Sequence, residues 1–315
     1  MRMENLLYGL NSVGPVFLLV VLGVVLRAVK LVDETLVSRI STLVFTIAVP
    51  ALVFTKISRT RFEEVFDGRL VLLAVLGAIV FFCLFWALSY LLVKEPRKRG
   101  PFIQGTVRGN NAIVSLAIVL NVYGESGASK AAVLLAFLMP LYNILSVIAL
   151  TVPMHRSGGG TWGRLVKRIV TNPIILAILA ALPFSYFSVR LPVVVDRSLG
   201  YLSQLTLPLA LLNIGASLRL SAVTKPMPAV PASFVKVVLY PAAMTAVAVA
   251  VGMRGETLGV LFIFVAAPTA VVSFIMARAM NNDAELAANI IALTTLCSVF
   301  TVGAGLVVLK GLQLI

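Results

Sequence analysis

Two stretches of this chain place polar or helix-breaking residues inside long apolar runs. Residues 108–115 read RGNNAIVS, and residues 266–273 read AAPTAVVS. A shift of 158 residue numbers lays the first stretch on the second, so that Asn110 falls on Pro268 and Ser115 falls on Ser273. Proline breaks a helix, and asparagine side chains compete for its backbone hydrogen bonds. The two stretches therefore predict interrupted helices at matching places in two halves of the chain.

The composition of the 315 residues is that of a membrane protein. Hydrophobic residues make up 60% of the chain and charged residues 12%, and the mean hydropathy is +1.05. These values exclude a soluble enzyme, a disordered chain and a coiled coil. Crossing a bilayer takes about 20 apolar residues. Ten runs have this character, and they predict an all-α membrane protein with ten transmembrane helices: residues 10–31, 36–58, 70–93, 102–122, 127–152, 165–187, 194–218, 230–252, 257–280 and 284–310.

The 158-residue shift relates the first five of these helices to the last five. It also lays Pro50 on Pro208 and Thr55 on Asn213. Because each half holds an odd number of helices, the second half must lie in the membrane upside down relative to the first. Such inverted repeats are typical of secondary transporters. We therefore expect a first repeat at 1–152, a cytoplasmic linker at 153–163 and an inverted second repeat at 164–315.

The charge of the chain predicts lipid contacts. Lys and Arg total 26 against 12 Asp and Glu, a formal net charge of +14. No RNA-binding aromatic motif or basic tail occurs, so we expect membrane lipids and no nucleic acid as partners. Basic residues are more frequent on the connections that are cytoplasmic when the N-terminus is outside. The sequence thus predicts a multi-pass protein of the plasma (inner) membrane with the N-terminus and C-terminus outside.

Few residues of the chain have the chemistry of a catalytic or metal site. Cys83 and Cys297 are far apart inside apolar runs, and His155, the one histidine, lies in a connection. All twelve carboxylates fall in loops or near predicted helix ends, which disfavours carboxylate-based proton coupling. No enzyme motif occurs, so we expect no enzymatic activity, no metal and no cofactor. Coupling to Na⁺ or H⁺ and uncoupled transport stay open.

The interrupted fourth and ninth helices are the predicted substrate site. The free N–H groups and the dipole at the start of a half-helix attract anions, and the amides of Asn110 and Asn111 add donors that orient a carboxylate. Arg108 either neutralises an anionic substrate or takes the place of a coupling cation; alternatively its side chain reaches the lipid headgroups. For Lys236 we favour the headgroups. Pro268 is alternatively a simple kink, and the asparagines alternatively bond neighbouring helices.

At these residues the chain resembles the auxin efflux carrier family, which includes plant PIN-type carriers and prokaryotic relatives. The resemblance runs through 44–54 (VFTIAVPALVF), 172–175 (NPII), 207–218 (LPLALLNIGASL) and 268–274 (PTAVVSF). The fourth helix departs from the family pattern, with Ser115 and Ala117 where the family has Gly and Pro. The break there then depends on residues 109–111.

The resemblance implies a fold like that of the sodium/bile acid symporters. Helices 1, 2, 6 and 7 would form a scaffold and helices 3–5 and 8–10 a mobile transport domain, with helices 4 and 9 broken and crossing. By this resemblance Asn110 contacts a substrate carboxylate, and Tyr142 and Asn143 on the fifth helix face the same cavity. A homodimer through the scaffold helices is a further expectation of the family.

Together, the residues and the resemblance predict a secondary transporter of small organic anions, carboxylates or auxin-like, that works by elevator-type alternating access. The alternatives are a sodium-coupled bile-acid-type symporter, a membrane ligand sensor that does not transport, and a channel, for which the polar residues are too few. The predicted substrate-binding residues are Asn110, Asn111, Arg108, Tyr142, Asn143, Pro268, Thr269 and Ser273. The predicted helix breaks and scaffold cavity residues are Gly109, Pro50, Thr55, Pro208 and Asn213.

Overall fold

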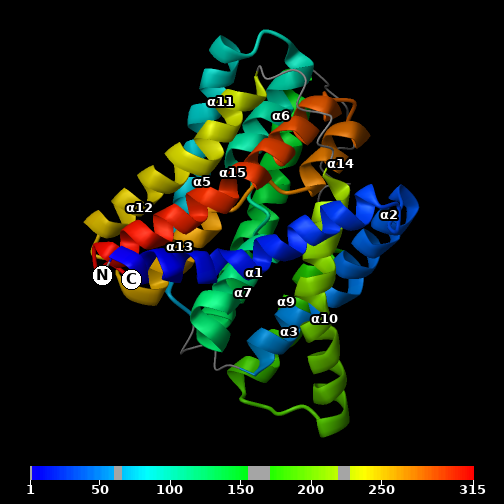
Figure 1. Cartoon of the computed structure of the whole chain (residues 1–315), viewed down its shortest axis with the longest axis vertical. Coiled ribbons are helices and arrows are strands. Elements are labelled where there is room, and N and C mark those ends of the chain that lie inside the picture. Colours follow the sequence, from blue (N-terminus) through cyan, green and yellow to red (C-terminus); the bar gives the residue numbers. More distant parts are fainter. Residues whose placement is uncertain (1, 60–65, 155–170, 219–227) are drawn as a thin grey trace.

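The computed structural model describes residues 2–59, 66–154, 171–218 and 228–315, and the regular structure of these residues is entirely helical (Figure 1). Among them the only β-type pairing is one isolated antiparallel bridge, between Gly109 and Thr269. The all-α class is therefore confirmed for the described residues. The elements, where η denotes a short π- or 3₁₀-helical segment, are α1 (Arg2–Ala28), α2 (Glu34–Leu43), η1 (Val44–Ala48), α3 (Val49–Ser58), α5 (Gly68–Leu92), α6 (Pro96–Val107), η2 (Asn111–Ser115), α7 (Leu116–Thr151), η3 (Val152–Met154), α9 (Pro173–Tyr186), α10 (Val193–Ser217), α11 (Ala229–Phe234), η5 (Val235–Leu239), α12 (Tyr240–Ala250), α13 (Gly255–Ala266), α14 (Val272–Ala279) and α15 (Ala284–Gly311).

Seven helical segments of the described residues are long and apolar enough to cross a membrane: Leu7–Ala28, Glu34–Ser58, Gly68–Leu92, Asn111–Met154, Val193–Ser217, Ala229–Ala250 and Ala284–Gly311. This number is smaller than the ten predicted runs. The fourth run is broken between α6 and η2, and the ninth run is broken between α13 and α14. Because η2 continues into α7, the segment Asn111–Met154 contains the end of the fourth run and the whole of the fifth. The sixth run is described only from residue 171, and the predicted linker lies, after Met154, outside the described residues. The predicted boundary between the fourth and fifth runs falls at Gly124, whose φ of 62° and ψ of −146° interrupt α7.

Short acidic and amide side chains start several of the long helices. Asp33, Asp67 and Asp283 accept backbone N–H bonds in the first turns of α2, α5 and α15, and Asn172 does the same for α9. An N-cap side chain satisfies donors that the first helical turn leaves unpaired. These carboxylates therefore hold helix ends and lie away from the middle of the spans.

The apolar surface of the molecule is that expected of a protein in lipid. Large apolar side chains project outward from α1, α10 and α15, with Leu18 69%, Val194 77% and Phe300 77% exposed. Polar side chains such as Thr206, Thr294 and Ser298 are buried. Apolar groups outside and satisfied polar groups inside are what a bilayer demands, because lipid tails offer no hydrogen bonds.

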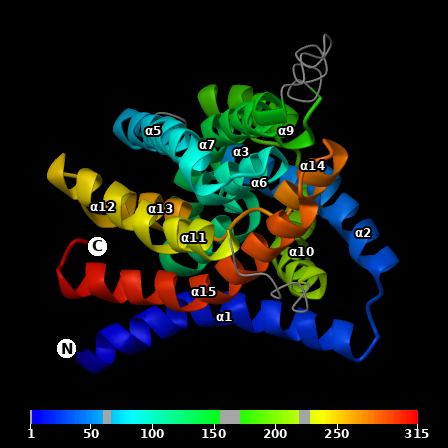
Figure 2. The same ribbon diagram turned by 90° about the horizontal axis from the view of Figure 1, so that it is seen from above.

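Glycines let α1 and α10 approach closely. A Cβ on Gly23 would lie 2.1 Å from the carbonyl oxygen of Leu212, and one on Gly215 would lie 1.9 Å from that of Val20. Small residues at such crossings allow backbones to touch, as is common between membrane helices. The helices α3 and α9 pack against each other too, and α3 packs on α10. In Figure 2, α1 also runs beside α15, and the two ends of the chain lie near each other in both ribbon views.

Two hydrogen bonds to backbone carbonyls join residues whose numbers differ by 158. The N–H of Asn110 donates to the carbonyl of Pro268 at 2.8 Å, where the interruption after α6 meets the interruption after α13. The hydroxyl of Thr206 on α10 donates to the carbonyl of Ala48 in η1 at 2.8 Å. Both contacts join the first half of the chain to the second half.

Candidate functional site

The first interruption is a short extended segment between α6 and η2. The helix α6 ends at Val107, Arg108 adopts φ −74° and ψ 106°, and Asn110 has φ −81° and ψ 58°. The carbonyl of Arg108 accepts the N–H of Ala270 at 3.2 Å, which adds a second backbone bond between the two interruptions. A Cβ on Gly109 would meet Oδ1 of Asn111 and would lie 3.3 Å from the carbonyl oxygen of Phe264, so a larger residue here would displace the Asn111 side chain. The crossing is thus held by main-chain pairing that continuous helices do not allow.

Two helix N-termini begin at this crossing without a side-chain cap. The segment η2, continued by α7, starts at Asn111, and α14 starts at Val272. Neither is capped by a side-chain hydrogen bond. The first turn of a helix presents free N–H groups and a partial positive charge. A cavity of about 40 Å³ lies against both starts, lined by Phe45, Arg108, Gly109, Asn110, Asn111, Ala112, Leu135, Leu138, Met139, Tyr142, Ala270 and Val272.

Arg108 brings a full positive charge to this cavity. The residue is 7% exposed. Its Nη1 donates to Ser146 Oγ at 2.9 Å and to Met276 Sδ at 3.1 Å, and its Nη2 donates to Asn143 Oδ1 at 2.9 Å. Within the described residues no carboxylate forms an ion pair with it. The sequence left two alternatives for Arg108, a guanidinium inside the protein or one that reaches the lipid headgroups. In the structure the guanidinium is buried inside the protein.

Asn110 and Asn111 both line the cavity, but their side chains differ in their hydrogen bonds. The backbone of Asn110 is fully engaged, since its carbonyl accepts the N–H groups of Val114 and of its helical neighbours. Its side chain makes no hydrogen bond with other described residues. Asn111 accepts Ser115 Oγ at its Oδ1, 3.1 Å away, while its Nδ2 is buried without a partner among the described residues. Both amides therefore keep donors available.

Tyr142 and Asn143 take separate roles on α7. Tyr142 is 5% exposed and lines the cavity. Asn143 is not among the lining residues, but its Oδ1 holds the guanidinium of Arg108. Ser146, which the sequence analysis missed, holds the same guanidinium one helical turn later. Its spacing of three residues from Asn143 places both on one helix face, a signal that was readable in the sequence.

The predicted residues of the second interruption mostly hold the crossing together. Pro268 contributes its carbonyl to Asn110. Thr269 donates its hydroxyl to the carbonyl of Gly105 at 2.8 Å and its N–H to Thr294 Oγ1 at 3.1 Å. Ser273 is 2% exposed and its hydroxyl has no partner among the described residues. None of the three lines the cavity, which Ala270 and Val272 border instead.

The four scaffold residues lie outside the cavity lining. Pro50 is in the first turn of α3, and Thr55 donates to the carbonyl of Ala51 within the same helix. Pro208 lies on the exposed side of α10. Asn213 donates to Ser41 Oγ of α2 at 2.7 Å, as an interhelical bond. The structure therefore does not bring these four residues to the crossing cavity.

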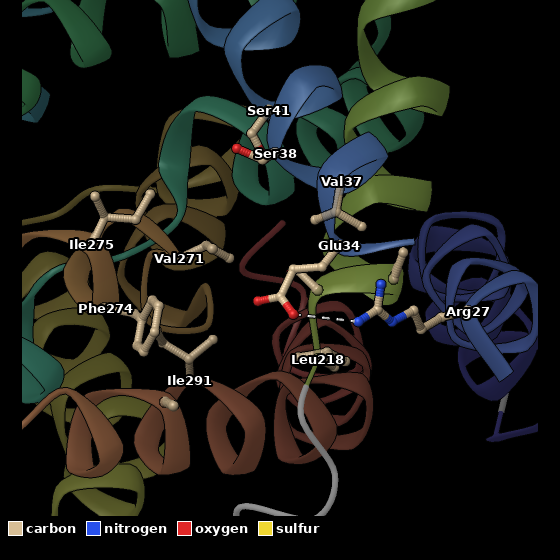
Figure 3. Close-up of a pocket in the computed structure, with 13 residues that line it drawn as sticks. Arg27, Glu34, Val37, Ser38, Ser41, Leu218, Val271, Phe274, Ile275 and Ile291 are labelled. Atoms are coloured by element: carbon tan, nitrogen blue, oxygen red, sulfur yellow. Dashed lines mark ion pairs between the residues drawn. The ribbon is translucent and has the colours of Figure 1, made fainter. Parts of the chain in front are cut away.

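A larger cavity of about 230 Å³ lies on the other side of the start of α14 (Figure 3). Phe274 and Ile275 of α14 and Val271, which precedes this helix, form one wall, and Ser38 and Ser41 of α2 belong to the opposite wall. Figure 3 shows Glu34 directed toward Arg27, with Oε2 and Nη2 3.7 Å apart. Val271 lines this cavity and Val272 lines the smaller one. The two cavities are thus separated by the first turn of α14.

The structure corrects the prediction for Lys236. We expected its side chain to reach the headgroups, but the residue is 0% exposed. Its Nζ donates to the carbonyl of Val265 at 2.8 Å, in the last turn of α13. The prediction was wrong because the sequence around a lysine inside an apolar run is the same whether its side chain faces lipid or the protein interior.

The described residues contain no group of three or more His, Cys, Asp or Glu side chains able to hold a metal ion.

Comparisons with known proteins agree with this architecture. A family described as membrane transport protein matches residues 8–163 and 162–304. The chain is 28% identical over 309 residues to a Rhizobium meliloti protein provisionally named as a malonate transporter, covering 91% of this chain and 92% of that protein. It is 23% identical to an uncharacterized transporter of Methanocaldococcus jannaschii, covering 91% of this chain and 94% of that protein.

Plant proteins match a smaller part. Auxin efflux carrier component 3a of Oryza sativa is 25% identical over 166 residues, which is 52% of this chain and 26% of that protein. The family match spans almost the whole chain, and its members are transporters rather than enzymes. This chain therefore belongs to the membrane transport protein family to which the auxin efflux carriers are related, and it is a multi-pass membrane transporter.

Proposed function

We propose that this protein is a secondary transporter of small organic anions and that the substrate carboxylate binds at the crossing of the two interrupted helices. The observation that carries the proposal is the buried guanidinium of Arg108, which has only neutral hydrogen-bond partners among the described residues. A buried charge without a counter-ion costs several kcal/mol. A bound anion lowers that cost, so the apo protein is arranged to attract one.

The two uncapped helix N-termini add to the positive electrostatic potential of Arg108. Each helix N-terminus carries a partial charge of about +0.5, and η2 and α14 both start at the cavity wall. The unengaged amide of Asn110 lies at the same place. A carboxylate there would accept hydrogen bonds from the guanidinium of Arg108, from backbone N–H groups and from one or two asparagine amides. Tyr142 and the apolar side chains of Leu135 and Met139 would enclose its other side.

The cavity size favours a small acid. A volume of about 40 Å³ accommodates roughly three water molecules, which is enough for a carboxylate head and little more. The name of the Rhizobium meliloti relative refers to malonate, a small dicarboxylate, and this class is our first choice of substrate. Auxin-like acids are the second.

We further propose that the chain is built from two inverted five-helix repeats. Supporting this, residues 158 apart contact each other at two places, Asn110 with Pro268 and Ala48 with Thr206. The close pairs α1 with α10 and α3 with α9 are also exchanged by the same shift. The reciprocal bond from residue 268 to residue 110 is missing because proline has no N–H. An elevator-type cycle, in which the part carrying the crossing moves against α1, α3, α9 and α10, follows from this proposal.

The location and assembly belong to the same proposal. We place the protein in the plasma (inner) membrane with both termini outside, as the distribution of basic residues favours. A homodimer would form through the scaffold helices. Accessibility of single cysteines added near the two termini to an impermeant reagent, and the mass of the purified protein in detergent, test these two statements directly.

The central test replaces Arg108. We expect Arg108→Gln to lower the affinity for the transported acid by at least about tenfold, because a charge-assisted hydrogen bond contributes about 1.5–3 kcal/mol. The measurement is uptake of radiolabelled malonate, other dicarboxylates, monocarboxylates and indole-3-acetate into proteoliposomes. The matched control is Arg97→Gln, on the exposed start of the same helix, where the arginine binds the carbonyl of Asn281. Unchanged uptake and binding in Arg108→Gln would contradict the proposed site.

A further inference from the structure

A second buried cation lies at the other interruption. Lys236, in η5, is 0% exposed and is among the largest fully buried side chains of the described residues. The only hydrogen bond of its ammonium among these residues is the one to the carbonyl of Val265, at 2.8 Å. The ring of Tyr240 lies beside it, with its centroid 5.0 Å from Nζ. No described carboxylate forms an ion pair with it.

The bonded carbonyl has a special position. Val265 is in the last turn of α13, which ends at Ala266 just before the interruption. The last four carbonyls of a helix lack intrahelical partners, and together they form the negative end of the helix dipole. In transporters with discontinuous helices, such half-helix ends coordinate the coupling Na⁺ or H⁺. In this chain the ammonium of Lys236 already occupies that end.

The elements around Lys236 contain further oxygen atoms without partners. Ser233 Oγ on α11, Gln104 Oε1 on α6 and Asn289 Oδ1 on α15 are buried and unbonded among the described residues. The helices α6, α13 and α15 all pack against η5, and α11 directly precedes it. Neutral carbonyl, hydroxyl and amide oxygens are the ligands that hard monovalent cations take in proteins. This region therefore has cation-binding chemistry with a side-chain cation in it.

We propose that the ammonium of Lys236 is a resident monovalent cation that replaces a coupling sodium ion at the end of α13, so that the protein works without sodium. The inference depends on the proposed function for its transport consequence, but not for its binding consequence. Because the charge of Lys236 is covalently attached, the charge at the crossing would be the same with or without sodium in the medium. An anion taken up at Arg108 would then cross with its own net charge and drive a current.

The first half of the chain has no equivalent of this lysine. The 158-residue shift lays Lys236 on Ala78, which is 0% exposed on α5. Each half-helix end also receives a hydroxyl from the other interruption: Thr269 donates to the carbonyl of Gly105 at 2.8 Å, and Ser115 donates to the carbonyl of Ile263 at 3.3 Å. Lys236 is therefore an addition at the end of α13, beyond the hydroxyl that each end has.

Thermal unfolding of the purified full chain tests the proposal without any substrate. Midpoints are compared in sodium chloride and in choline chloride at equal ionic strength. We expect the natural protein to unfold at the same temperature in both salts. We expect Lys236→Ala to unfold at a lower temperature in choline, with a saturable recovery in sodium, because the vacated position and its oxygens can take the ion. Lys236→Arg keeps the positive charge, so its unfolding midpoint should not respond to sodium.

Two matched variants separate charge from space. Lys236→Met keeps the length but not the charge, so it should be destabilised without a sodium response. Lys130→Ala removes a partly buried lysine that pairs with Glu256 at 2.8 Å, and it should show no sodium response. A saturable sodium shift in the natural protein would overturn the proposal. So would a Lys236→Ala variant that responds equally to sodium and choline.

A transport measurement gives an independent readout and covers the case in which Lys236→Ala does not fold. Uptake of the accepted acid by the natural protein should be the same with sodium or choline on both sides of the vesicle. Uptake that collapses without sodium would overturn the resident-cation proposal while leaving the anion site intact. Absence of uptake for every acid in the panel would count against the proposed function, and the unfolding comparison would still decide the sodium question.

Discussion

At the scale of single residues, the site is defined by charges that have no opposite charge. Arg108 and Lys236 are both buried and both bonded only to neutral groups among the described residues. By contrast Lys56, which is also largely buried, pairs with Glu125 at the interruption of α7. The three buried cations therefore differ in their partners rather than in their burial. The planar fork of Arg108 suits a carboxylate, and the compact ammonium of Lys236 suits a carbonyl.

The side chain of Asn110 gives the sharpest test at this scale. It makes no hydrogen bond with other described residues, so Asn110→Ala should leave the unfolding midpoint almost unchanged. The loss of a donor to a bound carboxylate should weaken substrate binding by about 10- to 100-fold, as expected for about 1.5–3 kcal/mol. Binding by calorimetry and thermal unfolding are measured on the same preparation.

Asn213→Ala is the matched control, because that amide bonds Ser41 between α10 and α2. It should lower the unfolding midpoint and leave the affinity nearly unchanged. If Asn110→Ala lost folding and binding in equal measure, its amide would be a packing residue and not a ligand.

At the scale of elements, the interruptions depend on residues that stop helices. Pro268 has no N–H and follows α13 directly, where Ala267 has φ −57° and ψ 145°. Residues 108–110 achieve the same in the first half with a glycine and an asparagine, which is why no proline is needed there. The helix α6 packs against α14, while α13 packs against η2 and α7, so each helix that ends at the crossing lies beside one that starts there. A partial negative charge and a partial positive charge therefore lie close together on each side of the crossing.

Replacing Pro268 tests whether this interruption is required. We expect Pro268→Ala to let α13 extend toward residue 268 and to disturb the bond between Asn110 and the carbonyl of residue 268, since proline in a helix costs about 3 kcal/mol relative to alanine. Uptake should fall at least about tenfold. Pro208→Ala is the control, because α10 continues through Pro208. It should keep uptake, and equal effects of the two substitutions would contradict a specific role for the interruption.

At the scale of the whole molecule, close helix contacts fix the frame in which the crossing is held. The pair α1 and α10 is packed so tightly at Gly23 and Gly215 that no side chain fits. The pair α3 and α9 lies on the other side of the contact between Ala48 and Thr206. The alternating-access cycle that we propose requires such a tightly packed part, against which the part that carries the crossing would move.

Gly215→Ala should break this frame. Its Cβ would fall 1.9 Å from the carbonyl oxygen of Val20, so the two helices must separate. We expect a clear fall in the unfolding midpoint, with a loss of about 1–3 kcal/mol from overpacking. Gly14→Ala on α1 has open space around its Cβ. This control should be neutral or slightly stabilising, because alanine favours a helix over glycine by about 1 kcal/mol. Equal midpoints for the two variants would contradict the tight packing.

Much of the fold could be predicted from the sequence because it depends on the length of apolar runs and on the residues that interrupt them. Runs of apolar residues placed the helices, and the shift that lays Asn110 on Pro268 placed the two interruptions. The sequence also singled out Arg108 and Asn143, whose side chains meet in the structure. It did not indicate that Pro50, Thr55, Pro208 and Asn213 lie outside the cavity, because spacing along a helix does not say how far apart two helices are.

The sequence by itself determined the membrane class, the helix positions, the interruptions and the family resemblance, since each depends on local composition or on a match between segments. Only the tertiary structure decided which polar residues face one another: that Arg108 meets Ser146 and Met276, and that Lys236 caps α13 instead of reaching the headgroups. The physical reason is that a helix has lipid on one side and protein on the other. A charged side chain is stable on either side if it finds a partner there, and only the packing of distant segments shows which partner that is.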